Sequence, residues 1–205
     1  MVLSPHTDDG EIGAGGTIAK FIEKGSEIFY LCFCGAEDVI PKGVPKDTLR
    51  NECRKATKLL GIKSQYVVIL NYKIREFHMA RQNILDDIIL YGNKFMPDLI
   101  LIPSSNDVHQ DHHTINQEAI RAFKKSSSIW GYEHPWNNLT FTTDVFIELD
   151  KRHIESKISA LKKYASQDYR TYLDETYIWS WANSRGTQID AKYAETFELI
   201  RLLVK

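Results

Sequence analysis

Short apolar segments alternate with helical segments through the first two thirds of this 205-residue chain. Parallel strands need crossover connections of a dozen or more residues, usually helices, so the alternation predicts a parallel sheet with right-handed crossovers. The elements expected from periodicity and turn residues are strands at 2–4, 27–33, 66–70 and 99–103, a long loop at 35–45, and helices at 13–24, 47–60 and 77–94.

The final third of the sequence is less regular. The elements expected there are a loop or edge strand at 132–143, a strand at 145–149, a helix at 151–165 and a last helix near 190–203. Neither a repeat nor a linker interrupts the chain, and 43% hydrophobic residues suffice for one core. We therefore expect a single domain over 1–205, of α/β class, with a Rossmann-like three-layer α/β/α arrangement around a mostly parallel sheet.

Charge and cysteine content narrow the function classes. The formal net charge is −1 and the basic residues are scattered, which argues against nucleic acid as a partner and favours a small, neutral or anionic substrate. Three cysteines in a chain of this length favour a reducing, cytoplasmic location. Neither a signal peptide nor an apolar run of about 18 residues is present, so membrane insertion is not expected. The oligomeric state stays open, and a homo-oligomer is compatible with the sequence.

A polar cluster follows the first predicted strand directly. His6, Asp8 and Asp9 lie between that strand and a glycine-rich helix start. Adjacent carboxylates in a loop can diverge, so that one binds a metal while the other takes a proton from attacking water, as metal-assisted hydrolysis requires. The alternative is that the two aspartates cap the following helix. His6, close to the two aspartates at the end of the strand, favours the metal site over helix capping.

A second polar cluster follows the apolar strand at 99–103. It runs from Asp107 to His112 and contains His109, Asp111 and His112, and the two histidines share one face if the segment begins a helix. Both clusters follow strand ends, where open α/β sheets bind ligands, so we expect them in one crevice. Two histidines and a carboxylate there could bind a divalent metal. Zinc with an open coordination position fits this ligand set best.

Other histidines and the glycines have simpler interpretations. His78, His113 and His153 are expected to be bystanders, whereas His134 is a candidate for the rim of the site. The glycines at 13–16 do not have the spacing of a dinucleotide fingerprint. They are expected to let the first helix pack closely on the sheet.

Together the two clusters resemble the LmbE-like or PIG-L family of zinc-dependent N-deacetylases. The family's first motif, Pro-His-Pro-Asp-Asp followed by Gly-x-Gly-Gly-Thr, corresponds to Pro5–Thr17, and its second, His-x-Asp-His, corresponds to His109–His112. Weaker similarities occur in the same order along the chain at Arg50-Asn51-Glu52, Leu60-Gly61, Pro97-Asp98, Ser166-Gln167, Arg185-Gly186 and Ala194-Glu195-x-Phe197.

The resemblance implies a role for each matching residue. Those roles are zinc binding by His6, Asp9 and His112, general base catalysis by Asp8, stabilisation of the oxyanion or protonation of the leaving amine by His109, orientation of His109 by Asp111, and contact of Arg50 with the sugar or its anionic attachment. Zn²⁺ is the implied cofactor, although another divalent ion also fits. Thr7 departs from the motif, since the family has proline there, and the first strand is short for its role, so we expect native residues before Met1.

The function implied by this resemblance is hydrolysis of the acetyl group from an N-acetylated amino sugar. The substrate would be a GlcNAc-type glycoconjugate or nucleotide sugar, and its attached group would be recognised by the loops at 35–46, 130–143 and 168–188. One alternative is a metal-dependent phosphoesterase, although two-metal phosphoesterases usually carry more carboxylates. Another is a non-catalytic sugar-binding module of the same fold, which would not require Asp8.

Overall fold

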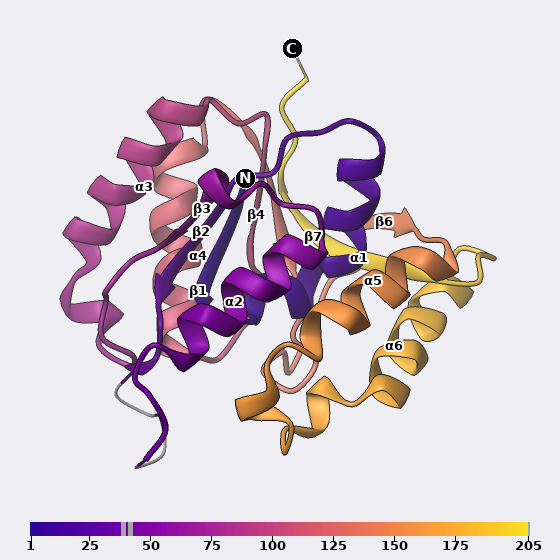
Figure 1. Ribbon diagram of the computed structural model, residues 1–205. Helices are drawn as coiled ribbons and strands as arrows, with labels where there is room; N and C mark the ends of the chain where they lie inside the picture. Colours follow the sequence, from indigo (N-terminus) through magenta and orange to yellow (C-terminus); the bar gives the residue numbers. More distant parts are fainter. Residues whose placement is uncertain (38–39, 41–42, 205) are drawn as a thin grey trace.

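The computed structural model describes residues 1–37, 40 and 43–204, so four residues of the loop predicted at 35–45 lie outside the described part. A seven-stranded sheet forms the centre of the molecule, with helices on both faces (Figure 1). Its strand order is β3-β2-β1-β4-β5-β7-β6. The strands are β1 (Val2–His6), β2 (Tyr30–Cys34), β3 (Val67–Ile69), β4 (Leu99–Pro103), β5 (Ser128–Tyr132), β6 (Val145–Glu148) and β7 (Ala194–Arg201).

The first five strands form a parallel sheet, whereas β7 pairs antiparallel with both β5 and β6. The predicted α/β class with a mostly parallel sheet is therefore confirmed. β1 lies between β2 and β4, so the chain leaves β1 toward one edge of the sheet and later returns to its other side. That reversal is the place where open α/β sheets bind ligands, beyond the carboxyl ends of the strands.

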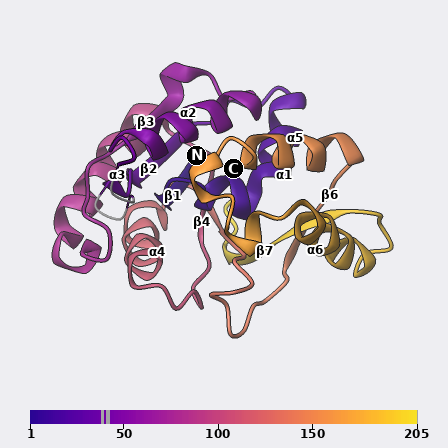
Figure 2. The same ribbon diagram turned by 60° about the horizontal axis from the view of Figure 1, so that its bottom comes forward.

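The α-helices form the outer layers, with α5 in contact with both α1 and α2, and α3 packed on α4. They are α1 (Asp9–Glu23), α2 (Thr48–Leu59), α3 (Arg81–Phe95), α4 (Gln110–Phe123), α5 (Lys151–Leu161) and α6 (Glu175–Thr187). Short 3₁₀ turns are η2 (Ser64–Tyr66), η3 (Phe77–Met79), η4 (Ala165–Gln167) and η5 (Thr171–Leu173). Figure 2 shows α2 and α5 on one side of the sheet and α4 on the other, which is the expected three-layer arrangement.

Helix α1 is kinked at Ala14, which has the non-helical angles φ −143° and ψ 15°. The kink leaves backbone amides after it without partners in the preceding turn. The N–H groups of Gly16 and Thr17 donate instead to the Glu195 carboxylate of β7, at 3.0 and 2.7 Å. Lys157 of α5 donates to the same carboxylate at 2.7 Å, and both side chains are buried. Elements from the end of the chain thus fix the helix that follows the first polar cluster.

Two glycines of α1 lie too close to the sheet for any side chain. A Cβ on Gly13 would be 2.5 Å from the Tyr132 ring, and one on Gly10 would be 2.8 Å from the Tyr30 ring. The predicted close packing of this helix is confirmed. The helix also begins earlier than expected, at Asp9, because β1 continues to His6 and leaves only two residues between strand and helix.

The prediction for the end of the chain is wrong. Residues 194–201, expected within a helix, form β7, and the helix lies earlier, at α6. The sequence of β7 contains Ala, two Glu and Leu, which favour helix intrinsically. Strand pairing on both sides and burial of the first four residues override that preference.

The cysteines and the helices can be compared with two further expectations, a packing role for the cysteines and the lack of a membrane-spanning segment. Cys32, Cys34 and Cys53 are free thiols inside the core, in agreement with a packing role. Among the described residues, none of the helices combines the length and apolar character needed to cross a membrane.

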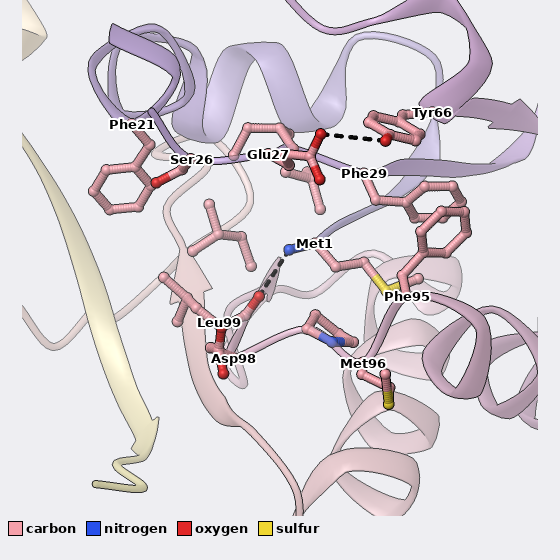
Figure 3. A pocket seen from close by; sticks show the side chains of 14 residues that line it. Met1, Phe21, Ser26, Glu27, Phe29, Tyr66, Phe95, Met96, Asp98 and Leu99 are labelled. Atoms are coloured by element: carbon pink, nitrogen blue, oxygen red, sulfur yellow. Dashed lines mark hydrogen bonds between the residues drawn. The ribbon is translucent and has the colours of Figure 1, made fainter. Parts of the chain in front are cut away.

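A cavity of about 520 Å³ lies at the end of the sheet where β1 and β4 begin (Figure 3). The Met1 ammonium group beside it donates to the Leu99 carbonyl oxygen at 2.8 Å, and burial lowers the pKa of this group to about 5. The aromatic residues Phe29 and Phe95 stack at its wall. Its lining includes Glu27 and Asp98 but no histidine, so it lacks the ligand set of the predicted site.

Candidate metal centre and active-site cavity

A second cavity, of about 380 Å³, opens at the carboxyl end of β1. Its lining includes residues from both predicted clusters, namely His6, Thr7, Asp8, Asp9, His109 and His112. The expectation that the fold brings the two clusters into one crevice is therefore met. The walls come from segments far apart in the sequence, through Ala36, Leu49, Ile74, Arg75, Trp136, Asn137, Gln167, Tyr169, Arg170 and Tyr172.

Three ligand atoms form a nearly equilateral triangle at the floor of the cavity. Nδ1 of His6 lies 3.1 Å from Oδ2 of Asp9, which lies 3.2 Å from Nε2 of His112. The two ring nitrogens are 3.3 Å apart. Ligand atoms about 2.0–2.1 Å from a tetrahedral zinc ion are separated by about 3.3 Å, so the triangle fits one face of such a site and leaves a fourth position open.

Two wider groups of ligand atoms also surround this position. The sets His6, His109, His112 and Asp9, His112, His134 each have ligand atoms within 4.8 Å of one another. Both sets contain His112, whose Nδ1 is already engaged by Asp107 at 2.7 Å, so only its Nε2 is available to a metal. These side chains therefore offer one metal position, and the tight triangle of His6, Asp9 and His112 has the best spacing for it.

Buried carboxylates hold the two triangle histidines by their other ring nitrogens. Nε2 of His6 lies 3.0 Å from Oδ2 of Asp111, and Nδ1 of His112 lies 2.7 Å from Oδ2 of Asp107. A ring N–H that donates to each carboxylate leaves the lone pair of the triangle nitrogen free for a metal. The carboxylates thus set both the tautomer and the orientation of the ligands.

The structure corrects the role predicted for Asp111. Its carboxylate accepts from His6 and from the backbone N–H groups of Arg75 and Phe77, at 2.6 and 3.2 Å, and does not contact His109. Asp111 is in the first turn of α4 with its side chain fully buried toward β1. It is the backbone N–H of Asp111 that donates to Nδ1 of His109, at 3.1 Å.

Asp107 begins the second polar cluster, but the sequence pattern assigns no role to it. Its carboxylate also accepts the backbone N–H of His109 at 2.9 Å and lies 3.5 Å from Nδ1 of His134. His134 itself is fully buried, with Nε2 3.1 Å from the carbonyl oxygen of Asp9, so it belongs behind the floor and not at the rim. The signal that could have revealed Asp107 is its position at the start of a segment with two candidate ligands, since metal-binding histidines usually have a carboxylate partner.

His109 forms the N-cap of α4, and its ring stacks on His112 with centroids 4.6 Å apart. Nδ1 accepts the Asp111 N–H, so the proton of the neutral ring is on Nε2. Burial lowers the pKa of His109 to about 4, with a further contribution from the charges of His112 and His6. At neutral pH this ring is therefore an uncharged hydrogen-bond donor.

Asp8 is the N-cap residue of α1, but its side chain makes no cap hydrogen bond, so the capping alternative does not describe it. Its φ of 86° lies in the left-handed region, which is costly for a residue with a side chain. Burial raises the pKa of Asp8 well above its usual value, and the charges of Asp9 and Glu11 act in the same direction. Arg170, at the cavity wall, opposes that shift.

The electrostatics of the triangle favour a cation. Burial alone would lower the pKa of His112, yet the charge of Asp9 and the hydrogen bonds to Asp107 and Asp9 raise that pKa to about 10. Burial would raise the pKa of Asp9, but the charges of and hydrogen bonds to His112 and His6 hold it well below its usual range. A positive charge among these atoms, as a proton or a metal, is strongly stabilised.

Arg50, predicted to bind substrate, does not line this cavity. Its guanidinium group pairs with Glu37 and donates to the backbone oxygens of Ile69 and Leu70 and to the side chain of Asn71. These contacts link α2 to the end of β3. The arginines at the cavity wall are Arg75 and Arg170, which the sequence did not single out because their position depends on loop conformation.

The chain is similar in sequence to a family of deacetylases. Residues 1–123 match the family model PIG-L, described as GlcNAc-PI de-N-acetylase. The chain is 27% identical over 175 residues to the uncharacterized deacetylase YaiS of Escherichia coli K12, which covers 81% of this chain and 90% of that protein.

Two solved structures share the fold at low sequence identity. The N,N′-diacetylchitobiose deacetylase of Pyrococcus horikoshii, complexed with an inhibitor, superposes with a TM-score of 0.80 at 22% identity, over 97% of this chain and 82% of that one. The 4-carboxy-2-hydroxymuconate hydratase GalB of Pseudomonas putida superposes with a TM-score of 0.77 at 21% identity, over 100% and 96%. Because one fold serves a deacetylase and a hydratase, the activity has to be argued from the residues of the site.

Proposed function

The chain belongs to the PIG-L family of deacetylases, and on that premise we propose that it is a zinc-dependent hydrolase that removes the acetyl group from an N-acetylated amino sugar. The observation that carries the proposal is the triangle of His6, Asp9 and His112, with ligand atoms 3.1 to 3.3 Å apart. The deacetylase from Pyrococcus horikoshii, which shares the fold, is named for a diacetylated sugar substrate and supports the choice of an N-acetylated sugar.

A divalent metal on the triangle would polarise the amide carbonyl and make water a stronger nucleophile at neutral pH. The residues around it supply the proton transfers. Asp8 would accept the proton of the attacking water and return it to the leaving nitrogen, and its place in the cavity beside Asp9, outside any capping contact, supports this role. The Nε2–H of His109 would donate to the oxygen that gains negative charge, a role that the acceptor contact at Nδ1 supports because it leaves the proton on Nε2.

The alternatives from the sequence receive less support from this geometry. A two-metal phosphoesterase needs a second cluster of ligands, whereas the ligand groups found here share His112 and describe one position. A non-catalytic binding module has no need of a carboxylate held at a φ of 86° in the cavity. Backbone strain of that kind is more often kept where a side chain takes part in chemistry.

The proposal is tested by metal analysis of the purified protein combined with a screen for acetate release. The panel should contain N-acetylated sugars, nucleotide sugars and glycosides of N-acetylglucosamine. We expect about one divalent ion per chain and acetate release that depends on it, with the activity lost in Asp8→Asn and kept in His113→Ala, an exposed neighbour of His112. Metal-loaded protein that releases acetate from none of these compounds would overturn the assignment.

A further inference from the structure

A serine hydroxyl in β1 closes the loop that carries the first polar cluster. Ser4 is fully buried, and its Oγ donates to the carbonyl oxygen of His6 at 2.5 Å and accepts the N–H of Gly10 at 3.0 Å. We call these two hydrogen bonds the Ser4 clamp. Asp8 lies between the two backbone groups, so one oxygen atom holds both ends of the segment that contains it.

The side chain of Asp8 gives this segment no support of its own. Within the described part of the chain, that side chain forms neither a hydrogen bond nor an ion pair. Its φ of 86° is unfavourable for a residue with a side chain and persists only where the surroundings fix it. The direction of the Asp8 carboxylate therefore depends on the contacts of the backbone around it.

The metal ligands of the same loop have further supports. His6 contacts the buried carboxylate of Asp111 at 3.0 Å. Asp9 accepts the backbone N–H of His6 at 2.8 Å and lies 3.2 Å from His112. Loss of the Ser4 clamp should therefore disturb Asp8 more than the triangle of ligands.

A buried tyrosine and a buried glutamate fix the Ser4 hydroxyl. The hydroxyl of Tyr30, on β2, lies 2.8 Å from Ser4 Oγ and also contacts the carboxylate of Glu11, on α1. The other carboxylate oxygen of Glu11 accepts the hydroxyl of Tyr164 at 2.7 Å. All four side chains are fully buried. Because buried polar groups are costly without hydrogen bonds, each of these contacts keeps the others in place.

The Tyr30 ring also limits the path of the loop. A Cβ on Gly10 would lie 2.8 Å from the Tyr30 hydroxyl oxygen, so the side chain and the Gly10 backbone are in direct contact. The end of the loop is thus held by the packing of this ring as well as by the hydrogen bond to Ser4.

This network lies behind the cavity. Ser4, Glu11, Tyr30 and Tyr164 are absent from the described residues that line it, so none of them is expected to touch a substrate. Tyr164 directly precedes η4, and its carbonyl oxygen accepts the N–H of Gln167, a residue of the cavity wall, at 2.8 Å. The network therefore joins the loop after β1 to a wall of the cavity through buried contacts.

We propose that Ser4, fixed by Tyr30 and Glu11, is a positioning residue that sets the direction of the Asp8 carboxylate for proton transfer. The part of this inference that concerns the reaction rests on the proposed function, whereas the part that concerns the loop does not. A displacement of about 1 Å in a reacting group can lower the rate by about 10²-fold. Loss of the Ser4 clamp should therefore reduce turnover without a comparable loss of metal.

Ser4→Ala tests the clamp, and Ser128→Ala is its matched control. Ser128 is also a buried strand serine whose hydroxyl contacts the backbone, but it lies where β5 begins, at the opposite end of the sheet. Acetate release should be followed with the panel compound that the wild type hydrolyses fastest, and metal affinity by chelator competition. We expect Ser4→Ala to lower kcat by about 10- to 100-fold, with KM and metal affinity within about threefold of the wild type. The control should behave as the wild type, and an unchanged kcat in Ser4→Ala would overturn the inference.

Tyr30→Phe is a milder second variant. It keeps the ring that packs on Gly10 and removes the hydroxyl that contacts Ser4 and Glu11. We expect kcat to fall by about three- to tenfold, less than in Ser4→Ala because both hydrogen bonds of the clamp remain. Thermal unfolding of each variant shows whether the protein used in these assays is folded.

A double variant distinguishes positioning of Asp8 from a general weakening of the site. If the clamp acts through Asp8, Ser4→Ala should change the residual turnover of Asp8→Asn by less than about twofold, because the group that it positions is already inactive. The same fractional loss of turnover in both backgrounds would show that Ser4 acts independently of Asp8 and would overturn the inference.

The loop also gives a readout that does not need turnover. Crystal structures of wild type and Ser4→Ala in one crystal form should differ at residues 7–9, where Asp8 leaves its left-handed φ or occupies more than one conformation. An unchanged loop would overturn the inference even if acetate release falls. If the metal-loaded wild type releases acetate from no compound of the panel, the proposed function fails, and the crystal structures alone decide whether Ser4 holds the loop.

Discussion

Asp107 accepts a hydrogen bond from Nδ1 of His112 at 2.7 Å, with both side chains buried. Since this contact fixes which ring nitrogen faces the metal position, we expect Asp107→Asn to weaken metal affinity by about 10- to 100-fold, the usual effect of losing such a partner. Competition with a chelator of known affinity measures the change. Asp86→Asn, at an exposed position of α3, is the control, and an unchanged affinity in Asp107→Asn would remove this residue from the metal centre.

Each ligand of the triangle should be needed for metal retention. The variants His6→Ala, Asp9→Ala and His112→Ala each remove one of three atoms that lie within 3.3 Å of one another, and should lose most of the bound metal after dialysis. The measurement is metal content per chain. His113→Ala should behave as wild type, because that ring is exposed and contacts Gln117. Full retention in all three ligand variants would rule out this centre.

Asp8→Asn should separate binding from catalysis. The substitution keeps the size of the side chain and removes its ability to accept a proton, so turnover should fall by about two to four orders of magnitude while metal content stays near that of the wild type. Initial rates of acetate release, measured beside metal analysis of the same sample, check both parts. Turnover within a few-fold of the wild type would exclude Asp8 as the base.

His109→Ala should slow the reaction without emptying the site. The ring stacks on His112 but lies outside the tight triangle, and its Nε2–H is the donor that we propose for the oxyanion. Loss of one such donor typically lowers turnover by about 10²- to 10³-fold. If instead His109→Ala loses the metal while His112→Ala retains it, the two histidines exchange roles.

Metal uptake should strengthen as the pH rises. Asp9 and Asp107 raise the pKa of His112 to about 10 against the effect of burial, so at pH 7 this ring is protonated in the metal-free protein. An incoming cation has to displace that proton, so affinity should rise about tenfold per pH unit between pH 7 and 9 and level off near pH 10. Chelator competition, corrected for protonation of the chelator, measures the slope, and a flat profile would contradict the proton displacement.

The polar clusters at His6 and at His112 could be predicted from the sequence because each directly follows an apolar strand, and strand ends in a parallel sheet meet at one edge. The local sequence pattern of a strand followed by polar residues was enough to locate both clusters. The partners of these residues could not be predicted in the same way. Asp111 differs from its expected role since a residue in the first turn of α4 reaches β1 only through the tertiary packing.

The loops that form the walls were predicted in part, because the segments 35–46, 130–143 and 168–188 all contribute to the lining of the cavity. The individual residues at the walls were not predicted. Arg75 and Arg170 lie in loops, where the sequence gives side chains without their positions, and Arg50 was placed by resemblance alone. The strand β7 was mistaken for a helix because its intrinsic preference opposes its pairing. Trp136, Arg170 and β7 all lie after residue 123, outside the segment that matches the family model.

The contact between Glu195 and the amides of α1 bears on the order in which the site can form during synthesis. The triangle residues are complete at residue 112, yet the helix that follows His6 is capped by a carboxylate more than 80 residues later. Contacts of such long range form late, since closing the intervening loop costs entropy first. Chains grow by about 5–20 residues per second, so the ligands emerge from the ribosome seconds before their anchor. A nascent chain thus carries all three candidate ligands before the helix that begins at Asp9 is fixed.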